Sequence, residues 1–248
     1  MVISMKIVGD THTHTVACGH ATGTLTENAM YAAKKGHRFV AITEHSGDMP
    51  GAPIYWFFNN MLWHLPPMVE GIFLLKGIEA NIVNIRGELD FPEEVMAKLD
   101  IVIASVHFSE NFEHGDFTAE DYTNMYCRAA LNPLIDIIGH CDDPRFEFDE
   151  ERIVRAFREN DKIVEFNAAS QKSRIGSEAK CRRILELCKR YGAKVTVASD
   201  AHAAQGVGEV QSCIDVLREL NFPEELVVNA DYDRFCKEMH RRKGLQLI

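Results

Sequence analysis

The sequence predicts an α/β fold, a distorted (β/α)7 barrel of the TIM type with one unit fewer than the usual eight. Short apolar segments of strand character alternate with helical segments along the chain, and this alternation is typical of a parallel sheet. There are seven such strands, and six of them end at a His, Glu or Asp residue. An open, doubly wound sheet is the alternative. It would gather ligands near one switch point, whereas polar residues at nearly every strand end favour a barrel.

The seven expected strands are short, and each runs directly into a polar residue. They cover residues 6–9, 39–42, 73–78, 101–106, 134–139, 163–166 and 195–199. The polar residues that follow them are Asp10, Glu44, Glu79, His107, His140, Asn167 and Asp200. Because a parallel barrel carries its chemistry at the C-terminal ends of its strands, we expect the functional site on this rim.

Helix signals lie between the strands. Thr24 is an expected N-cap with an acid three residues later, and Gly36 closes that helix. Thr118 and Asp121 resemble a capping box that opens a second helix, through about residue 131. Further helices are expected over residues 149–160, 177–192, 209–220 and 231–242. We find no linker, low-complexity stretch or internal repeat, so residues 1–248 are expected to form one domain.

Residues 46–69 do not fit the alternation. The segment follows the strand that ends at His45, and it is rich in aromatic residues and proline. We expect a loop that overhangs the barrel mouth, either as a substrate lid or as a satellite hydrophobic cluster.

Composition limits the class of protein. The hydrophobic fraction of 46% is enough for a large core, which argues against disorder. The formal net charge of −10 argues against a surface that coats nucleic acid, although bound cations could still attract an anionic substrate. Seven cysteines without a C-x-x-C pair indicate reduced thiols. No membrane span or signal peptide is recognised, so we expect a soluble cytoplasmic protein. The oligomeric state is left open, and a homo-oligomer is compatible with the sequence.

The pattern His12-Thr13-His14 indicates a metal site. Alternate residues of a strand point the same way, so both imidazoles can reach one ion. Asp10, two residues earlier, is expected to hold one of the histidine rings in orientation.

Nine residues of metal-ligand type lie at or just after the expected strand ends. They are His12, His14, His20, His45, Glu79, His107, His140, Asp200 and His202. A catalytic zinc ion needs three protein ligands and an open position, so nine are too many for one ion, and a bridging carboxylate would let them serve three. We expect divalent ions, with zinc favoured by the histidines and iron or manganese as alternatives.

These residues resemble the PHP family, named for its polymerase-associated and histidinol-phosphatase members. The family motif D-x-H-x-H matches Asp10 to His14, and later motifs match Glu44-His45, His107 and Asp200-Ala201-His202. The segments 15–20, 41–45 and 77–82 are similar to the bacterial YcdX-type subgroup. The likeness runs from Asp10 to about Pro223. Two residues depart from the common pattern: Cys141 stands where Pro is frequent, and Glu44 where Asp is frequent.

The resemblance implies a distorted seven-stranded barrel with a trinuclear centre, in which Glu79 bridges two ions. The first ion would be bound by His12, His14, Glu79 and Asp200, the second by Glu79, His107 and His140, and the third by His20, His45 and His202. Such centres activate a hydroxide and clamp the oxygens of a phosphoryl group.

We therefore expect a phosphatase that hydrolyses small phosphate monoesters, with histidinol phosphate as one candidate substrate. Asp10, Asp200 and His202 are the candidate catalytic residues. Lys172 and Arg174 are expected to grip the phosphate, although a solvated basic turn is an equal reading of them.

Three other classes stay open. A metal-dependent nuclease or phosphodiesterase would fit the family, but it is disfavoured by the negative charge. A non-catalytic metal-binding protein would be expected to have lost ligands. Amidohydrolases share the H-x-H pattern, but they commonly use a bridging lysine where this chain offers Glu79 and His107.

Overall fold

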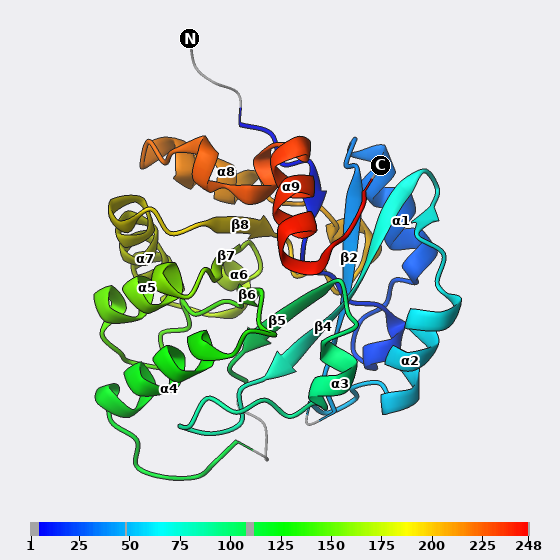
Figure 1. Ribbon diagram of the computed structural model, residues 1–248. Helices are drawn as coiled ribbons and strands as arrows, with labels where there is room; N and C mark the ends of the chain where they lie inside the picture. The colour runs from blue at the N-terminus through cyan, green and yellow to red at the C-terminus, as the bar shows by residue number, and fades with distance from the viewer. Residues whose placement is uncertain (1–4, 48, 108–111, 248) are drawn as a thin grey trace.

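Parallel strands form a nearly closed barrel in the computed structural model, which describes residues 5–47, 49–107 and 112–247 (Figure 1). The strands in barrel order are β1 (Gly9–Asp10), β2 (Phe39–His45), β4 (Ile72–Asn81), β5 (Ile101–Ser105), β6 (Ile137–Ile138), β7 (Ile163–Asn167) and β8 (Val195–Ala198). Each neighbouring pair in this order is parallel. A short strand, β3 (Met68–Val69), pairs antiparallel with β4. The expected (β/α)7 barrel is confirmed.

The seam between β8 and β1 is closed by residues just beyond the two strands and by one side chain. Thr13 and Ala201 form a parallel bridge, and the backbone N–H of Asp200 donates to the carbonyl of His12 at 3.0 Å. A few residues earlier in the two segments, the side-chain amide of Asn229 donates to the carbonyls of Gly9 and Val197 at 2.9 and 2.7 Å. The amide therefore takes the place of a strand neighbour at the seam.

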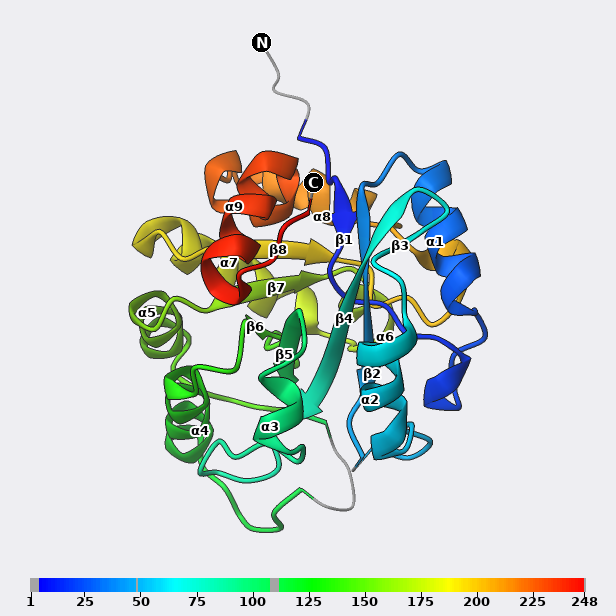
Figure 2. The same cartoon turned by 45° about the vertical axis from the view of Figure 1, so that its right-hand side comes forward.

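Helices surround the barrel (Figure 2). The expected ones are α1 (Leu25–Lys34), α4 (Ala119–Leu131), α5 (Glu150–Glu159), α7 (Ser177–Tyr191), α8 (Gln211–Glu219) and α9 (Tyr232–Lys243). Thr24 and Thr118 make complete capping boxes, as their sequence context predicts. Two four-residue helices are also present, α3 (Glu93–Met96) and α6 (Ser170–Ser173). Among the helices in the described ranges, none is long and apolar enough to cross a bilayer.

The segment after β2 contains a helix, α2 (Tyr55–His64), where we expected a loop. Phe58 and Met61 are buried in a cluster with Ile42 of β2 and Ile78 of β4, so α2 covers the outer face of the barrel. The expected hydrophobic cluster is present. The sequence of this segment shows no clear helical period, so we attribute the helix to tertiary packing.

The barrel interior is apolar at its N-terminal end. Phe39, Leu75 and Ile103 share a buried cluster with Phe235 and Met239 of α9. The rings of Phe39 and Phe235 stack at 3.9 Å between centroids. Helix α9 therefore closes this end, and polar side chains are left at the other end of the barrel.

Candidate metal centre

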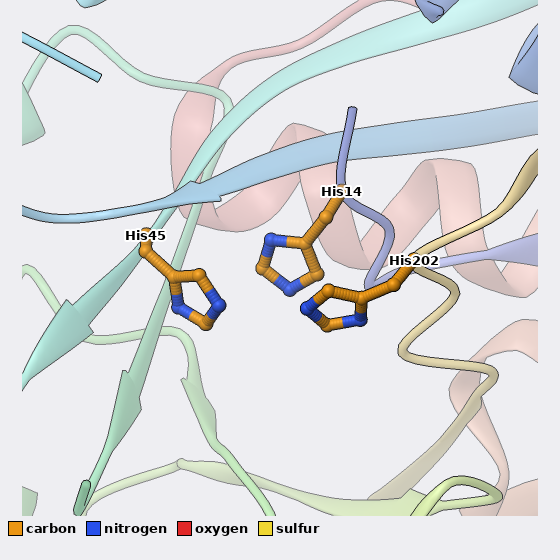
Figure 3. Close-up of side chains that lie close together, drawn as sticks. All are labelled: His14, His45 and His202. Atoms are coloured by element: carbon orange, nitrogen blue, oxygen red, sulfur yellow. The ribbon is translucent and has the colours of Figure 1, made fainter. Parts of the chain in front are cut away.

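The C-terminal ends of the strands bring nine expected ligands to one place. They come from the segment after β1 (His12, His14, His20), from β2 and β4 (His45, Glu79), from the segments after β5 and β6 (His107, His140) and from the segment after β8 (Asp200, His202). Figure 3 shows how the rings of His14, His45 and His202 converge from three separate elements. The structure thus joins residues that lie up to 190 positions apart in the chain, from His12 to His202.

The deepest group consists of His12, His14, Glu79 and Asp200, all buried. The Nε2 atoms of the two histidines are 3.0 Å apart. Each Nε2 lies 3.3–3.6 Å from Glu79 Oε2 and from Asp200 Oδ1. Four ligand atoms placed tetrahedrally about 2.0–2.1 Å from a zinc ion are themselves about 3.3–3.4 Å apart. The observed separations therefore fit one tetrahedral ion.

The other oxygen of Glu79 faces a second group. Glu79 Oε1 lies 2.9 Å from His140 Nε2 and 3.4 Å from His107 Nε2. Ser105 also donates its hydroxyl proton to this oxygen at 2.6 Å. Gly139 makes room for that serine, because a Cβ at this position would lie 2.1 Å from Ser105 Oγ. One carboxylate thus faces two groups of nitrogen ligands, one with each oxygen.

The third group is closest to solvent. His20 Nε2 and His202 Nε2 are 3.1 Å apart, and the ring of His45 stacks on His20 with a centroid distance of 5.0 Å. His20 is exposed and the His202 side chain is 34% exposed, whereas the His45 side chain is buried. A ligand would therefore enter the centre from the side of His20 and His202.

Several buried atoms of the centre have no hydrogen-bonding partner in the described part of the chain. They include both ring nitrogens of His45 and Oε2 of Glu79, although His45 Nδ1 lies 2.8 Å from that oxygen without the geometry of a hydrogen bond. Buried polar atoms without a partner cost about 1–3 kcal/mol each, so their persistence calls for a ligand. Cations of the zinc type accept both nitrogen and carboxylate ligands, so the donor set fits them.

The carboxylates of the centre are ionised. Burial alone would raise the pKa of Glu79, but the charges of His12, His107 and His45 hold this pKa well below its usual value. Burial is likewise outweighed at Asp200, where His12 and His14 keep the pKa well below its usual value. Burial also lowers the pKa of His12, yet Glu165, Glu79 and Asp200 raise it well above its usual value. The carboxylates of the centre are therefore charged, which favours the binding of a cation.

Two residues of β7 support the expected ligands: Glu165, which sequence reasoning missed, and Asn167, which it named only as the polar residue at a strand end. Glu165 of β7 lies with Oε1 2.6 Å from His12 Nδ1, and its Oε2 accepts the backbone N–H of His140 at 2.8 Å. Asn167, two positions later, donates to Glu165 and to Asp200, both at 3.1 Å. Their spacing of two on a strand that ends at the rim was the available signal, because alternate residues face the same side.

Arg174 approaches the centre, whereas Lys172 does not. The Arg174 guanidinium lies 3.8 Å from Asp200 Oδ2 and donates to Ser170 Oγ at 3.1 Å. Ser170 in turn donates to Asp142 at 2.9 Å, and burial raises the pKa of Asp142 to about 6. Lys172 is exposed on α6. Of the two expected phosphate contacts, Arg174 lies beside Asp200, an expected metal ligand, whereas Lys172 faces solvent.

Comparison with known proteins identifies the family. The PHP domain matches residues 10–170, and the PHP-associated family matches residues 178–224. The chain belongs to the PHP family. It is 42% identical over 246 residues to a probable phosphatase of Caldanaerobacter subterraneus subsp. tengcongensis, with 98% of this chain and 96% of the relative covered. It is 39% identical over 239 residues to a probable phosphatase of Acetivibrio thermocellus, with 96% and 98% covered.

Two solved structures share the PHP fold. One is histidinol phosphate phosphatase from Lactococcus lactis subsp. lactis, complexed with zinc, L-histidinol and phosphate. Its TM-score is 0.58 at 18% identity, with 87% of this chain and 94% of that chain covered. The other is a putative histidinol phosphatase from Listeria monocytogenes, with a TM-score of 0.61 at 20% identity and coverages of 83% and 99%. At these identities the likeness concerns the fold.

Asp10 of the first PHP motif has contacts that differ from those we expected. Its carboxylate accepts the backbone N–H groups of His12, Ser199 and Gly208 at 3.3, 3.1 and 2.8 Å. It also accepts the Ser199 hydroxyl proton at 2.5 Å. Asp10 thus fastens β1 to the end of β8, and the carboxylate that contacts Nδ1 of His12 is Glu165 instead.

The two departures from the PHP pattern lie behind the ligands. Cys141 is buried in the hydrophobic core, and burial raises the pKa of its thiol well above the usual value, so it packs rather than binds. Burial raises the pKa of Glu44 to about 7, even though Thr15 donates to its carboxylate from both backbone and side chain.

Cys18, which the sequence did not single out, lies within 4.8 Å of ligand atoms of His20 and His202.

Proposed function

We propose that this PHP protein is a metal-dependent phosphatase that hydrolyses the phosphate monoesters of small molecules. The observation that carries the proposal is the buried carboxylate of Glu79, each oxygen of which faces a different set of histidines. A shared carboxylate is what a multinuclear hydrolytic centre requires, and a single structural ion would not need it. The names of the two relatives, both probable phosphatases, support this reading.

Three divalent ions would be distributed over the three groups of ligands. His12, His14, Glu79 and Asp200 would hold the first ion, and Glu79, His107 and His140 the second. His20, His45 and His202 would hold the third. Zinc suits a set of seven imidazoles and two carboxylates, and iron or manganese would also be accepted by these ligands.

Different side chains would have different roles in the proposed reaction. When bound, the ions lower the pKa of a coordinated water molecule and neutralise charge on the phosphoryl group. Arg174 would donate to the phosphate from the side of Asp200, and the charge of a guanidinium makes such hydrogen bonds strong. His202 is the most accessible of the catalytic candidates, with Asp200 buried beneath it, so the leaving group would depart on the side of His202.

The substrate class is a small ester rather than a nucleic acid. A surface with a net charge of −10 repels a polyanion, whereas a small monoester can enter the cationic centre. Histidinol phosphate is a reasonable member of a test panel, because the L. lactis phosphatase of the same fold is complexed with L-histidinol and phosphate. Activity on single-stranded DNA that exceeds activity on monoesters would favour the nuclease alternative.

The test is a comparison of the wild type with Glu79→Gln, using Glu94→Gln on the exposed face of α3 as the matched control. Elemental analysis should find about three ions per chain in the wild type and in the control, and fewer in Glu79→Gln. Hydrolysis of p-nitrophenyl phosphate should fall by more than about 100-fold, since losing groups that only orient metal ligands already costs about 10–100-fold. Full metal content with no ester hydrolysis would favour the binding-protein alternative, and unchanged hydrolysis in Glu79→Gln would overturn the proposal.

A further inference from the structure

The polar residues behind His107 form a hydrogen-bond network whose direction is fixed. We propose that Asn81 and Asp90 are positioning residues that set the ring orientation and tautomer of His107, and through it the occupancy of the metal position that His107 shares with Glu79 and His140. This inference rests on the proposed function only in that it takes these three residues as metal ligands. Neither Asn81 nor Asp90 is a ligand itself.

The contact with His107 comes from the neighbouring strand. Asn81 is the last residue of β4, and its Oδ1 lies 2.6 Å from Nδ1 of His107, which follows β5. The other ring nitrogen, Nε2, lies 3.4 Å from Glu79 Oε1. An amide oxygen can only accept a hydrogen bond, so it selects the tautomer with the proton on Nδ1. That tautomer leaves the lone pair of Nε2 free for an ion.

The amide of Asn81 cannot turn over, because its nitrogen already has two acceptors. Nδ2 donates to Asp90 Oδ2 at 2.6 Å and to Ser46 Oγ at 2.9 Å. The hydroxyl proton of Ser46 is used on Asp90 Oδ1 at 2.5 Å, so the serine oxygen is left as an acceptor towards Asn81. The backbone N–H of Asn81 also donates to Asp90 Oδ1, at 2.9 Å.

The carboxylate of Asp90 is therefore the final acceptor of this network, since it accepts from the amide of Asn81, from the hydroxyl of Ser46 and from the backbone N–H of Asn81. An ionised carboxylate has acceptors only, so a reversed amide would place its oxygen against the oxygens of Asp90. Asp90 fixes the amide, the amide fixes the tautomer, and the tautomer decides whether Nε2 can bind an ion. The network also links the ends of β2 and β4, since Ser46 follows directly after the ligand His45.

The test exchanges donor and acceptor without changing size. In Asp90→Asn the new amide can donate to a reversed Asn81, whose nitrogen would then face His107 and favour the proton on Nε2. Glu88→Gln is the matched control, because it makes the same chemical change on the same hairpin at a side chain that is 59% exposed. The double variant Asn81→Asp/Asp90→Asn restores an acceptor towards His107 and a donor from position 90.

Two readouts need no substrate. Long-range 1H–15N spectra of the metal-free protein should show His107 protonated on Nδ1 in the wild type, on Nε2 in Asp90→Asn, and on Nδ1 again in the double variant. After dialysis against buffered Zn²⁺, Asp90→Asn should hold about one ion fewer per chain, with affinity for that ion lower by about 10–100-fold. The double variant should recover most of the loss, and Glu88→Gln should match the wild type.

Two results would overturn the inference. One is an unchanged tautomer and metal content in Asp90→Asn. The other is a loss in Asp90→Asn that the double variant does not recover, because that would indicate a packing role. A protein that passes these tests but hydrolyses no phosphate ester would contradict the proposed function and leave this inference standing.

Discussion

Glu79 shows how one residue can organise a whole site. Its carboxylate is buried and contacts His12, His14 and His45 through Oε2, and His107 and His140 through Oε1. An ionised carboxylate without compensation would be very costly at this depth. The surrounding histidines offset that cost partly, and under the proposed function bound cations would offset the rest.

At the residue scale, we expect Arg174→Ala to weaken phosphate binding. Arg174 is fixed by Ser170 and lies beside Asp200, so its loss should raise KM for p-nitrophenyl phosphate by about 10-fold or more, the weight of one charged hydrogen bond. Inorganic phosphate should become a weaker inhibitor by a similar factor. The same substitution at the exposed Lys172 should change either value less than about twofold. Equal effects at the two positions would contradict the placement of Arg174.

At the element scale, the barrel seam depends on side chains more than on strand pairing. β1 has only two residues, and Asp10 and Asn229 supply hydrogen bonds that a longer pair of strands would supply from the backbone. Backbone groups in a buried position must be paired, so the polar residues at the seam are structural requirements. This explains why an aspartate of the first motif can matter without touching a ligand ring.

We expect Asp10→Ala to lower the free energy of unfolding by about 2–4 kcal/mol, because it leaves the buried N–H of Ser199 and the half-buried N–H of Gly208 without their acceptor. Urea unfolding measures this, with the exposed Asp215→Ala on α8 as the control. An Asp10→Ala variant with unchanged stability and full metal content, but without one limb of the pH–rate profile, would instead support a catalytic role for Asp10.

Lys162 joins the end of α4 to the start of β7 and gives a pH prediction. Its ammonium group donates to the carbonyls of Asn132 and Ile135 at 2.6 and 2.7 Å, and burial lowers its pKa to about 8 from the usual 10.5. Between these two values the unfolded chain binds a proton that the folded chain does not. The contribution of Lys162 to the free energy of unfolding therefore increases as the pH rises from about 8 to 10.5. The same contribution is lost when the pH falls back through 8.

Lys162→Met should remove this dependence. Relative to the variant, the wild type should gain on the order of 1 kcal/mol in unfolding free energy between pH 8 and pH 10, after allowance for solvent screening. Urea unfolding at both pH values measures the difference, and Lys98→Met at an exposed position is the control. Parallel pH curves for the wild type and Lys162→Met would contradict the prediction.

At the scale of the whole molecule, the two ends of the barrel differ. Apolar side chains fill one end, and charged side chains line the other. Phe39 and Phe235 stack at the closed end, whereas Glu79, Asp200 and Glu165 concentrate negative charge at the other. The arrangement allows a chain with a net charge of −10 to present a cationic pocket once ions are bound. We therefore expect the stability of the molecule to depend on the occupancy of the site.

We expect removal of the ions by a chelator to lower the thermal midpoint. One ion at about 1,000 times its dissociation constant adds about 4 kcal/mol, which corresponds to roughly 10 °C for a chain of this size, so the loss of all ions should lower the midpoint by at least this much. Scanning calorimetry before chelation, after it and after zinc is added back measures the effect, which should be reversible. Glu79→Gln should show a much smaller shift, and an equal midpoint with and without ions in the wild type would contradict the coupling.

The sequence by itself determined the alternation of strands and helices, the capping boxes at Thr24 and Thr118, and the rim of candidate ligands. These features are local: a strand period of two, a cap three residues from its partner, and a polar residue at the end of an apolar run can each be read within a few residues. The family motifs added the division of the ligands among ions, which local patterns do not contain.

Only the tertiary structure decided which polar atoms meet. Glu165 contacts His12 across 153 positions of the chain, and Asn81 turns towards His107 because Asp90 and Ser46 hold its other side. Asp10 was assigned to a histidine ring from its proximity in sequence, yet it closes the seam with Ser199. These contacts depend on which strand ends become neighbours and which way each side chain faces there. Long-range packing fixes both, and no short stretch of sequence encodes either.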